Sequence, residues 1–154
     1  MRRIIPWLFL LLISFMASSQ DVSERVKVVY KPGDSAVIIK EWILEGAKFS
    51  KTDSARAQEY FLKAIGVAQR NKDLWLLADA KMKFAEFLFS RQLMHRSFGN
   101  FFEAKEIYLK LDAPQELVLA TMGVARTQYH RGNYRNSLRN FLEAVTLAKK
   151  TGMT

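Results

Sequence analysis

The sequence contains no cysteine, and it has only three proline and seven glycine residues among 154. The lack of cysteine excludes disulfide bonds, thiolate metal sites, a cysteine nucleophile and a lipid-modified N-terminus. Few residues break helices, while helix-favouring alanine, leucine, lysine and glutamate are plentiful. With 49% hydrophobic and 25% charged residues, the composition is that of a folded domain. The sequence therefore predicts an all-α protein with one modest core.

No long run of one charge occurs, although the formal net charge is +9. The basic residues are scattered along the predicted helices. A positive balance of this kind fits an acidic partner or an anionic surface, and it also fits a solvated helix face that has no partner.

The patterns that carry catalysis are missing as well. His95 and His130 have no carboxylate or second histidine at ligand spacing, so we expect no metal site. No glycine-rich loop follows a strand and no nucleophile elbow occurs, which removes the usual signs of phosphate binding and serine hydrolysis. Glu103 and Glu106 resemble a carboxylate pair, but we interpret the first as a capping residue and the second as an ion-pair partner. The sequence predicts a protein without catalytic residues or cofactors, not an enzyme.

Residues 1–19 have the three parts of a secretory signal peptide. Two arginines precede an apolar stretch from Ile4 to Met16, and small residues follow up to Ser19. The apolar stretch is short for a membrane span. We predict cleavage after Ser19 and a periplasmic or secreted protein, with an uncleaved membrane anchor as the alternative. Residues 20–34 are expected to form a linker.

Residues 91–98 mix basic and aromatic side chains, a combination that can contact nucleic acid. The predicted signal peptide argues against such a partner, so we expect that the protein does not bind nucleic acid. We interpret this stretch as a loop in which Phe98 and Phe102 pack back on a helix hairpin.

The strongest pattern in the sequence is an internal repeat. Gly132-Asn133-Tyr134 stands 33 residues after Gly99-Asn100-Phe101. Matching small and aromatic residues follow both turns at the same offset, and they pair as Ala104 with Ser137, Tyr108 with Phe141, and Leu111 with Ala144. A fainter copy, 47 residues before the middle one, supplies Ala57, Phe61 and Ala64. A period in the thirties with helical spacing is typical of stacked helix pairs.

Helical periodicity and capping residues predict the element boundaries. The helices are expected at about 35–50, 53–70, 74–91, 101–111, 114–131 and 134–150. Thr52-Asp53-Ser54 supplies an N-cap, and Asp73 supplies the next. Pro114 suits the first turn of a helix, and Gly152 suits a C-terminal cap.

The middle copy departs from the other two. Asn100 is expected to cap the helix over 101–111, in a capping box with Glu103. About seven extra residues, Leu93 to Gly99, then separate the two helices of this pair.

The small-x3-aromatic-x2-small spacing behind a Gly-x-aromatic turn resembles the tetratricopeptide repeat, a 34-residue helix pair. The resemblance covers about residues 35–150, and it implies an all-α solenoid of about three antiparallel helix pairs after the signal peptide. Small residues would let the helices approach, while Phe61, Tyr108 and Phe141 fill the space between them. No copy has the family's full Trp-Leu-Gly-Tyr set.

The resemblance also implies a protein-binding groove formed by the first helix of each pair. The candidate groove residues are Asp79, Met82, Glu86, Phe89, Met122, Arg126, Tyr129 and His130. The alternative is that these side chains are merely exposed or packed against neighbours. The lysine clamp that some family members use for acidic C-termini is missing, because methionines 82 and 122 stand at its positions.

A signal, a linker and such an array resemble the periplasmic front part of bacterial sensor kinases and regulators. The chain stops at residues 151–154, where another repeat normally begins, so we expect a truncated piece of such a signalling protein. A free-standing envelope scaffold is the alternative. The expected partner is a protein or peptide. We also expect self-association through the uncapped helix 134–150, and membrane attachment only through an uncleaved signal or a missing downstream segment.

Overall fold

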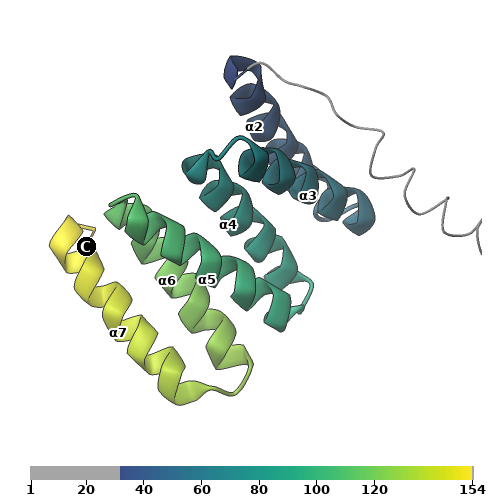
Figure 1. The fold of residues 1–154 in the computed structure, drawn as a ribbon. Coiled ribbons are helices and arrows are strands. Elements are labelled where there is room, and N and C mark those ends of the chain that lie inside the picture. The colour runs from purple at the N-terminus through teal and green to yellow at the C-terminus, as the bar shows by residue number, and fades with distance from the viewer. Residues whose placement is uncertain (1–31, 154) are drawn as a thin grey trace, which may run out of the picture. The chain divides into compact units, whose positions relative to one another are not determined.

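The computed structural model describes residues 32–153, and in that range the chain forms six helices and no strand (Figure 1). The helices are α2 (Pro32–Phe49), α3 (Ser54–Arg70), α4 (Leu74–Ser90), α5 (Met94–Lys110), α6 (Pro114–His130) and α7 (Tyr134–Thr151). The all-α prediction is confirmed. The expected signal peptide and nearly all of the expected linker lie outside the described residues.

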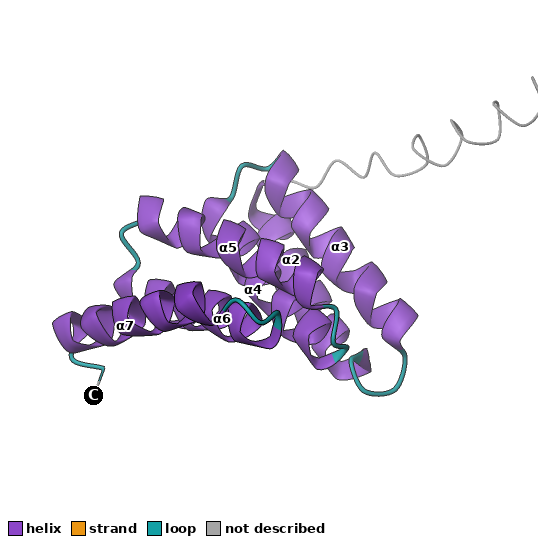
Figure 2. Cartoon of the chain, turned by 90° about the horizontal axis from the view of Figure 1, so that it is seen from below, coloured by secondary structure: helices purple, strands orange, loops and turns teal. Residues whose placement is uncertain are grey.

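Consecutive helices pack against each other and are joined by short linkers, so they form the three pairs α2/α3, α4/α5 and α6/α7 (Figures 1 and 2). Two further contacts join α2 to α4 and α4 to α6. The first helices of the pairs therefore line up along one side of the array. Each pair contacts only its neighbours, as in an α-solenoid, which confirms the predicted fold class.

The repeat length in the structure is 40 residues, because the second helices begin at Ser54, Met94 and Tyr134. Equivalent residues follow from this spacing. The aromatic positions are Phe61, Phe101 and Phe141, and the small positions are Ala57, Ser97, Ser137, Ala64, Ala104 and Ala144. The two serines make the same bond, from the Ser97 hydroxyl to the Ala85 carbonyl at 2.8 Å and from Ser137 to Ala125 at 2.9 Å.

The prediction for the middle copy was wrong. Helix α5 begins at Met94, so Leu93 to Gly99 are not an insertion but largely its first two turns. Asn100 lies inside the helix and donates to the Arg96 carbonyl at 2.9 Å, while Glu103 forms an ion pair with Lys81 at 2.7 Å. Seven residues make almost two helical turns, so the slipped alignment kept small and large residues on the same face.

The expected loop around Phe98 is also helical. Phe98 and Phe102 stack with ring centroids 5.9 Å apart, one turn from each other within α5. The predicted packing on the hairpin is present only for Phe98, which lies partly buried against the core, whereas Phe102 is 45% exposed; a helix holds both residues instead of a loop.

The remaining boundary signals are confirmed. The Asp53 and Asp73 carboxylates accept hydrogen bonds at 3.0 Å from backbone N–H groups at the starts of α3 and α4. Pro114 opens α6. Gly132 and Gly152 adopt left-handed backbone angles, with φ of 77° and 72°, which glycine reaches without steric strain.

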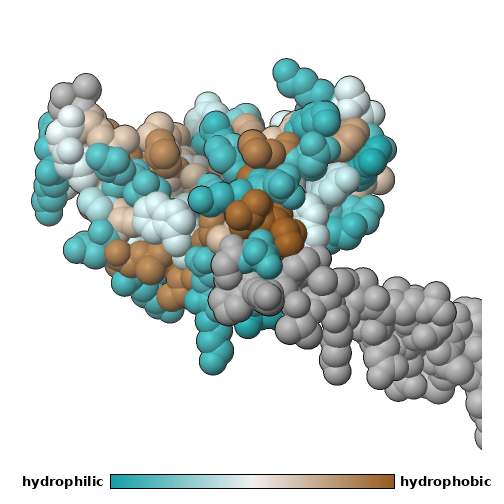
Figure 3. All heavy atoms as spheres, turned by 90° about the horizontal axis from the view of Figure 1, so that it is seen from above, coloured by the Kyte–Doolittle hydropathy of each residue, from teal (hydrophilic) through white to brown (hydrophobic). Residues whose placement is uncertain are grey.

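Aromatic side chains fill the space between successive pairs, with one exception. Phe61 and Phe101 are each 1% exposed, and Tyr108 is also buried, whereas Phe141 is 36% exposed. The expectation that Phe141 is enclosed like the others was wrong, because no described helix follows α7 to cover it. On the face shown in Figure 3, hydrophobic patches are separated by hydrophilic side chains.

Candidate functional site: a groove between α4 and α6

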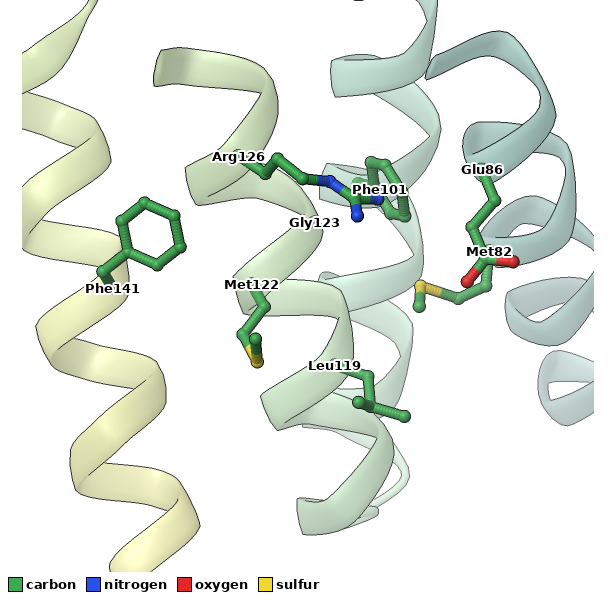
Figure 4. Close-up of a pocket in the computed structure, with 8 residues that line it drawn as sticks. All are labelled: Met82, Glu86, Phe101, Leu119, Met122, Gly123, Arg126 and Phe141. Atoms are coloured by element: carbon green, nitrogen blue, oxygen red, sulfur yellow. The ribbon is translucent and has the colours of Figure 1, made fainter. Parts of the chain in front are cut away.

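A cavity of about 200 Å³ lies between the first helices α4 and α6 (Figure 4). Met82 and Glu86 line it from α4, and Leu119, Met122 and Arg126 line it from α6. Phe101, Gly123 and Phe141 complete the lining. The cavity is mostly apolar, with one carboxylate and one guanidinium at its edge.

The floor of this groove depends on a residue without a side chain. A Cβ atom built on Gly123 would lie 2.4 Å from Cδ1 of Phe101, which is closer than real atoms approach. Glycine at this position therefore lets α6 pass directly over the buried Phe101 ring.

Arg126 is held in place by aromatic rings. Its guanidinium carbon lies 4.2 Å from the ring centroid of Phe89 and 5.9 Å from that of Phe101. Contacts of this kind are worth about 0.5–1 kcal/mol at exposed sites. Arg126 makes no hydrogen bond or ion pair with the residues that the structure describes, so its N–H donors remain available to an acceptor on a ligand.

An aromatic cluster continues the groove toward the C-terminal ends of α4 and α6. The His130 ring meets Phe89 edge-on at 5.0 Å and Tyr129 at 5.8 Å, and Tyr129 meets Tyr134 at 5.3 Å. Phe89 and His130 also line a second, more open cavity, together with Ser90, Gln92 and Met94. His130 is thus an aromatic packing partner in this structure.

Asp79 lies apart from both cavities and is half-buried. Burial raises the pKa of its carboxyl above the usual value, and the nearby Lys83 partly opposes this shift. Burial also raises the pKa of the Tyr108 hydroxyl, and the charge of Asp79 adds to that effect. These shifts describe a packed, poorly solvated carboxylate.

The structure thus brings together six of the eight predicted groove residues. Met82, Glu86, Met122 and Arg126 share the first cavity, and Phe89 and His130 share the second. The remaining two are Tyr129, which contacts His130, and Asp79, which stands apart.

Four residues that line the first cavity were not predicted from the sequence. Leu119 lies one turn before Met122 on the same face of α6, so helical spacing alone predicts it. The other three can be predicted only when the register of α5 and of α7 against α6 is known, and the sequence alone does not give that register. They are Phe101, Gly123 and Phe141.

Comparison with protein-family models, with curated proteins and with solved structures found no match. The structure therefore supports a helical repeat, while membership of the tetratricopeptide family stays a prediction. None of the six helices within residues 32–153 is long and apolar enough to cross a membrane.

Proposed function

We propose that this chain is a non-catalytic protein-interaction module of the tetratricopeptide type, which binds a peptide segment in the groove between α4 and α6. The observation that carries the proposal is the cavity of about 200 Å³, in which apolar side chains stand beside an arginine without an ion-pair partner among the described residues. Peptide-binding sites commonly combine an apolar pocket with a few polar groups that fix orientation.

The chemistry of the groove suggests the kind of segment that it binds. Met82, Met122 and Leu119 offer flexible apolar surface for one large side chain. The N–H donors of Arg126 suit a carboxylate one or two residues away. The preferred segment therefore carries an acidic residue next to a large apolar residue.

The tetratricopeptide assignment rests on the three stacked helix pairs and on the small and aromatic positions that they share. The 40-residue repeat is longer than the family's 34-residue pattern, and the helices of 17 or 18 residues account for the difference. In the proposed role, the module is the extracytoplasmic region of a signal-transduction protein. A free-standing envelope scaffold is the second candidate, since a leader followed by helical repeats fits both.

Selection from a random peptide display library tests this function. We expect peptides that pair an acidic with a large apolar residue, and we expect their affinity to fall about tenfold or more with Met122→Glu or Arg126→Gln. Arg70→Gln, at the exposed end of α3, is the control and should leave affinity unchanged. If selected peptides bind all four proteins equally well, the groove is not the binding site.

A further inference from the structure

Arginines gather in the last helix pair. Residues 117–142 contain four arginines and no acidic residue. Three of them, Arg131, Arg135 and Arg139, follow one another at intervals of four residues from the end of α6 into α7, and all three are exposed. Residues four apart on a helix are surface neighbours, so the Arg135 and Arg139 side chains stand side by side on α7. The three residues form an arginine row at this end of the pair.

The side chains of the arginine row have no acceptor among the described residues of the protein. Every ion pair within residues 32–153 uses a lysine, and no side-chain hydrogen bond in that range involves the row. Arg131 contacts an aromatic ring instead, with its guanidinium carbon 5.0 Å from the ring centroid of Phe98 on α5. Such a contact orients the guanidinium group and leaves its N–H donors free. The row therefore offers donors to a carboxylate of another molecule.

The fold itself does not require arginine at these positions. Helices α3, α5 and α7 begin 40 residues apart, so equivalent positions can be compared directly. At the positions of the two α7 arginines, α5 has His95 and Gly99. Helix α3 has Ala55 and Glu59 there. The other two pairs thus build the same packing without arginine or lysine at this place, and the row is a feature of the last pair alone.

Apolar side chains accompany the arginine row. Phe98 stacks on Phe102 with ring centroids 5.9 Å apart, and Phe102 is exposed. Leu142, three residues after Arg139, is exposed as well. The contact between Arg131 and Phe98 joins the row to the aromatic pair. The surface thus combines guanidinium groups with aromatic and aliphatic area, and arginine and aromatic residues are enriched at protein interfaces.

Carboxylates limit the extent of this positive surface. Glu143 follows Arg139 by one turn of α7 and pairs with Lys105 of α5 at 2.7 Å. Glu106, one turn after Phe102 on α5, makes no ion pair within the described helices. A long and uniformly negative partner, such as a nucleic acid or a membrane surface, would meet these carboxylates. A short acidic segment reaches the row without meeting them.

We propose that the arginine row binds an acidic segment of a partner protein. In a helical segment, carboxylates four residues apart match the spacing of Arg135 and Arg139, and arginine can bind a carboxylate through two parallel hydrogen bonds. An apolar residue of the segment packs on Phe102. The row shares no residue with the two cavities above, and helical spacing places Arg135 and Arg139 on a different face of α7 from Phe141. The proposal is therefore independent of peptide binding in the groove.

Titration of the full chain with labelled peptides tests the proposal by fluorescence anisotropy. The probe is a helical peptide of about 15 residues, with Glu at every fourth position and Leu beside the last Glu. The matched control peptide has Gln in place of each Glu. We expect saturable binding of the probe and at least about tenfold weaker binding of the control peptide. Equal affinity of the two peptides would overturn the proposal.

Two double variants of equal net charge supply the second arm. Arg135→Gln combined with Arg139→Gln should weaken probe binding at least about fivefold. Lys149→Gln combined with Lys150→Gln removes the same charge from the other end of α7 and should bind like the wild type. All four positions are exposed, so circular dichroism should show unchanged folding. Equal affinities of the two double variants for the probe would overturn the proposal, because net charge alone would then explain binding.

Further titrations separate the other occupants. The alternatives are a single-stranded oligonucleotide and vesicles that contain phosphatidylglycerol, and we expect both to bind the row more weakly than the probe does. Tighter binding of either one, lost in the arginine double variant and kept in the lysine double variant, would assign the row to nucleic acid or membrane instead. Arg126→Gln, in the groove, should leave probe binding unchanged. A loss as large as that of the arginine double variant would place the probe in the groove and overturn the proposal.

Discussion

Replacing glycine by alanine at two helical positions should change stability in opposite directions. In Gly66→Ala the new Cβ meets only the flexible end of Arg70, at an ordinary 3.5 Å. In Gly123→Ala it would lie 2.4 Å from the Phe101 ring, which is buried between α5 and α6. Position 66 is therefore a matched control for the close approach at position 123.

The magnitudes follow from two opposing effects. Alanine is favoured over glycine inside a helix by about 1 kcal/mol, and this gain applies to both variants. Overpacking a well-filled core costs about 1–3 kcal/mol, and this loss applies only at Gly123. We expect Gly66→Ala to raise the free energy of unfolding by up to about 1 kcal/mol, and Gly123→Ala to lower it by up to about 2 kcal/mol.

Urea unfolding followed by circular dichroism measures both changes in the free energy of unfolding. The comparison requires that the slope of this free energy against urea concentration is the same in both variants. The comparison is robust because both substitutions add the same methyl group to a helix interior. If Gly123→Ala were as stable as Gly66→Ala, Phe101 would not lie beneath α6, and the register of the middle pair would be wrong.

Three further outcomes follow. Phe101→Ala should lower the free energy of unfolding by about 3–5 kcal/mol, and Phe141→Ala by less than about 2 kcal/mol because that ring is partly solvated already; equal losses in urea unfolding would contradict the repeat register. Folding raises the pKa of the Asp79 carboxyl, so the folded protein binds the Asp79 proton more tightly than the unfolded chain does. Protonated Asp79 therefore stabilises the fold, and this stabilisation is lost as the pH rises above 3.8. Asp79→Asn should therefore melt higher than the wild type at pH 7, with an advantage that shrinks toward pH 3.8, and an advantage independent of pH would refute this cause. Mass spectrometry of protein exported by a bacterial host should find Gln20 at the N-terminus, whereas cytoplasmic protein beginning at Met1 would contradict the predicted leader.

Much of the fold could be predicted because several helix ends carry chemical signals. Aspartate caps mark the starts of α3 and α4, and a proline marks the start of α6. Helix α5 has no such signal, since Leu93 precedes it and forms no side-chain capping bond. The Gly99-Asn100 pair inside that helix has the same sequence as the true turn at Gly132-Asn133. The sequence alignment of the two repeats was therefore displaced by about two helical turns.

The candidate site could be predicted only in part, for a related reason. Spacing along one helix identifies Met122 and Arg126 as neighbours, because both lie on one face of α6. Contacts between helices depend on register and on what covers each helix. Phe141 has the same residue type and spacing as Phe61 and Phe101, so only the structure distinguishes the exposed ring from the buried ones.

Methyl NMR of the methionines tests the central claim, that the groove between α4 and α6 binds a peptide segment, most directly. The chain has six methionines. Two of them, Met82 and Met122, line the groove, while Met153 follows α7 and serves as an internal control. Titration of methyl-labelled protein with a display-selected peptide should shift the Met82 and Met122 signals saturably and leave Met153 unchanged. Saturable binding that moves Met153 but neither groove methionine would contradict the account.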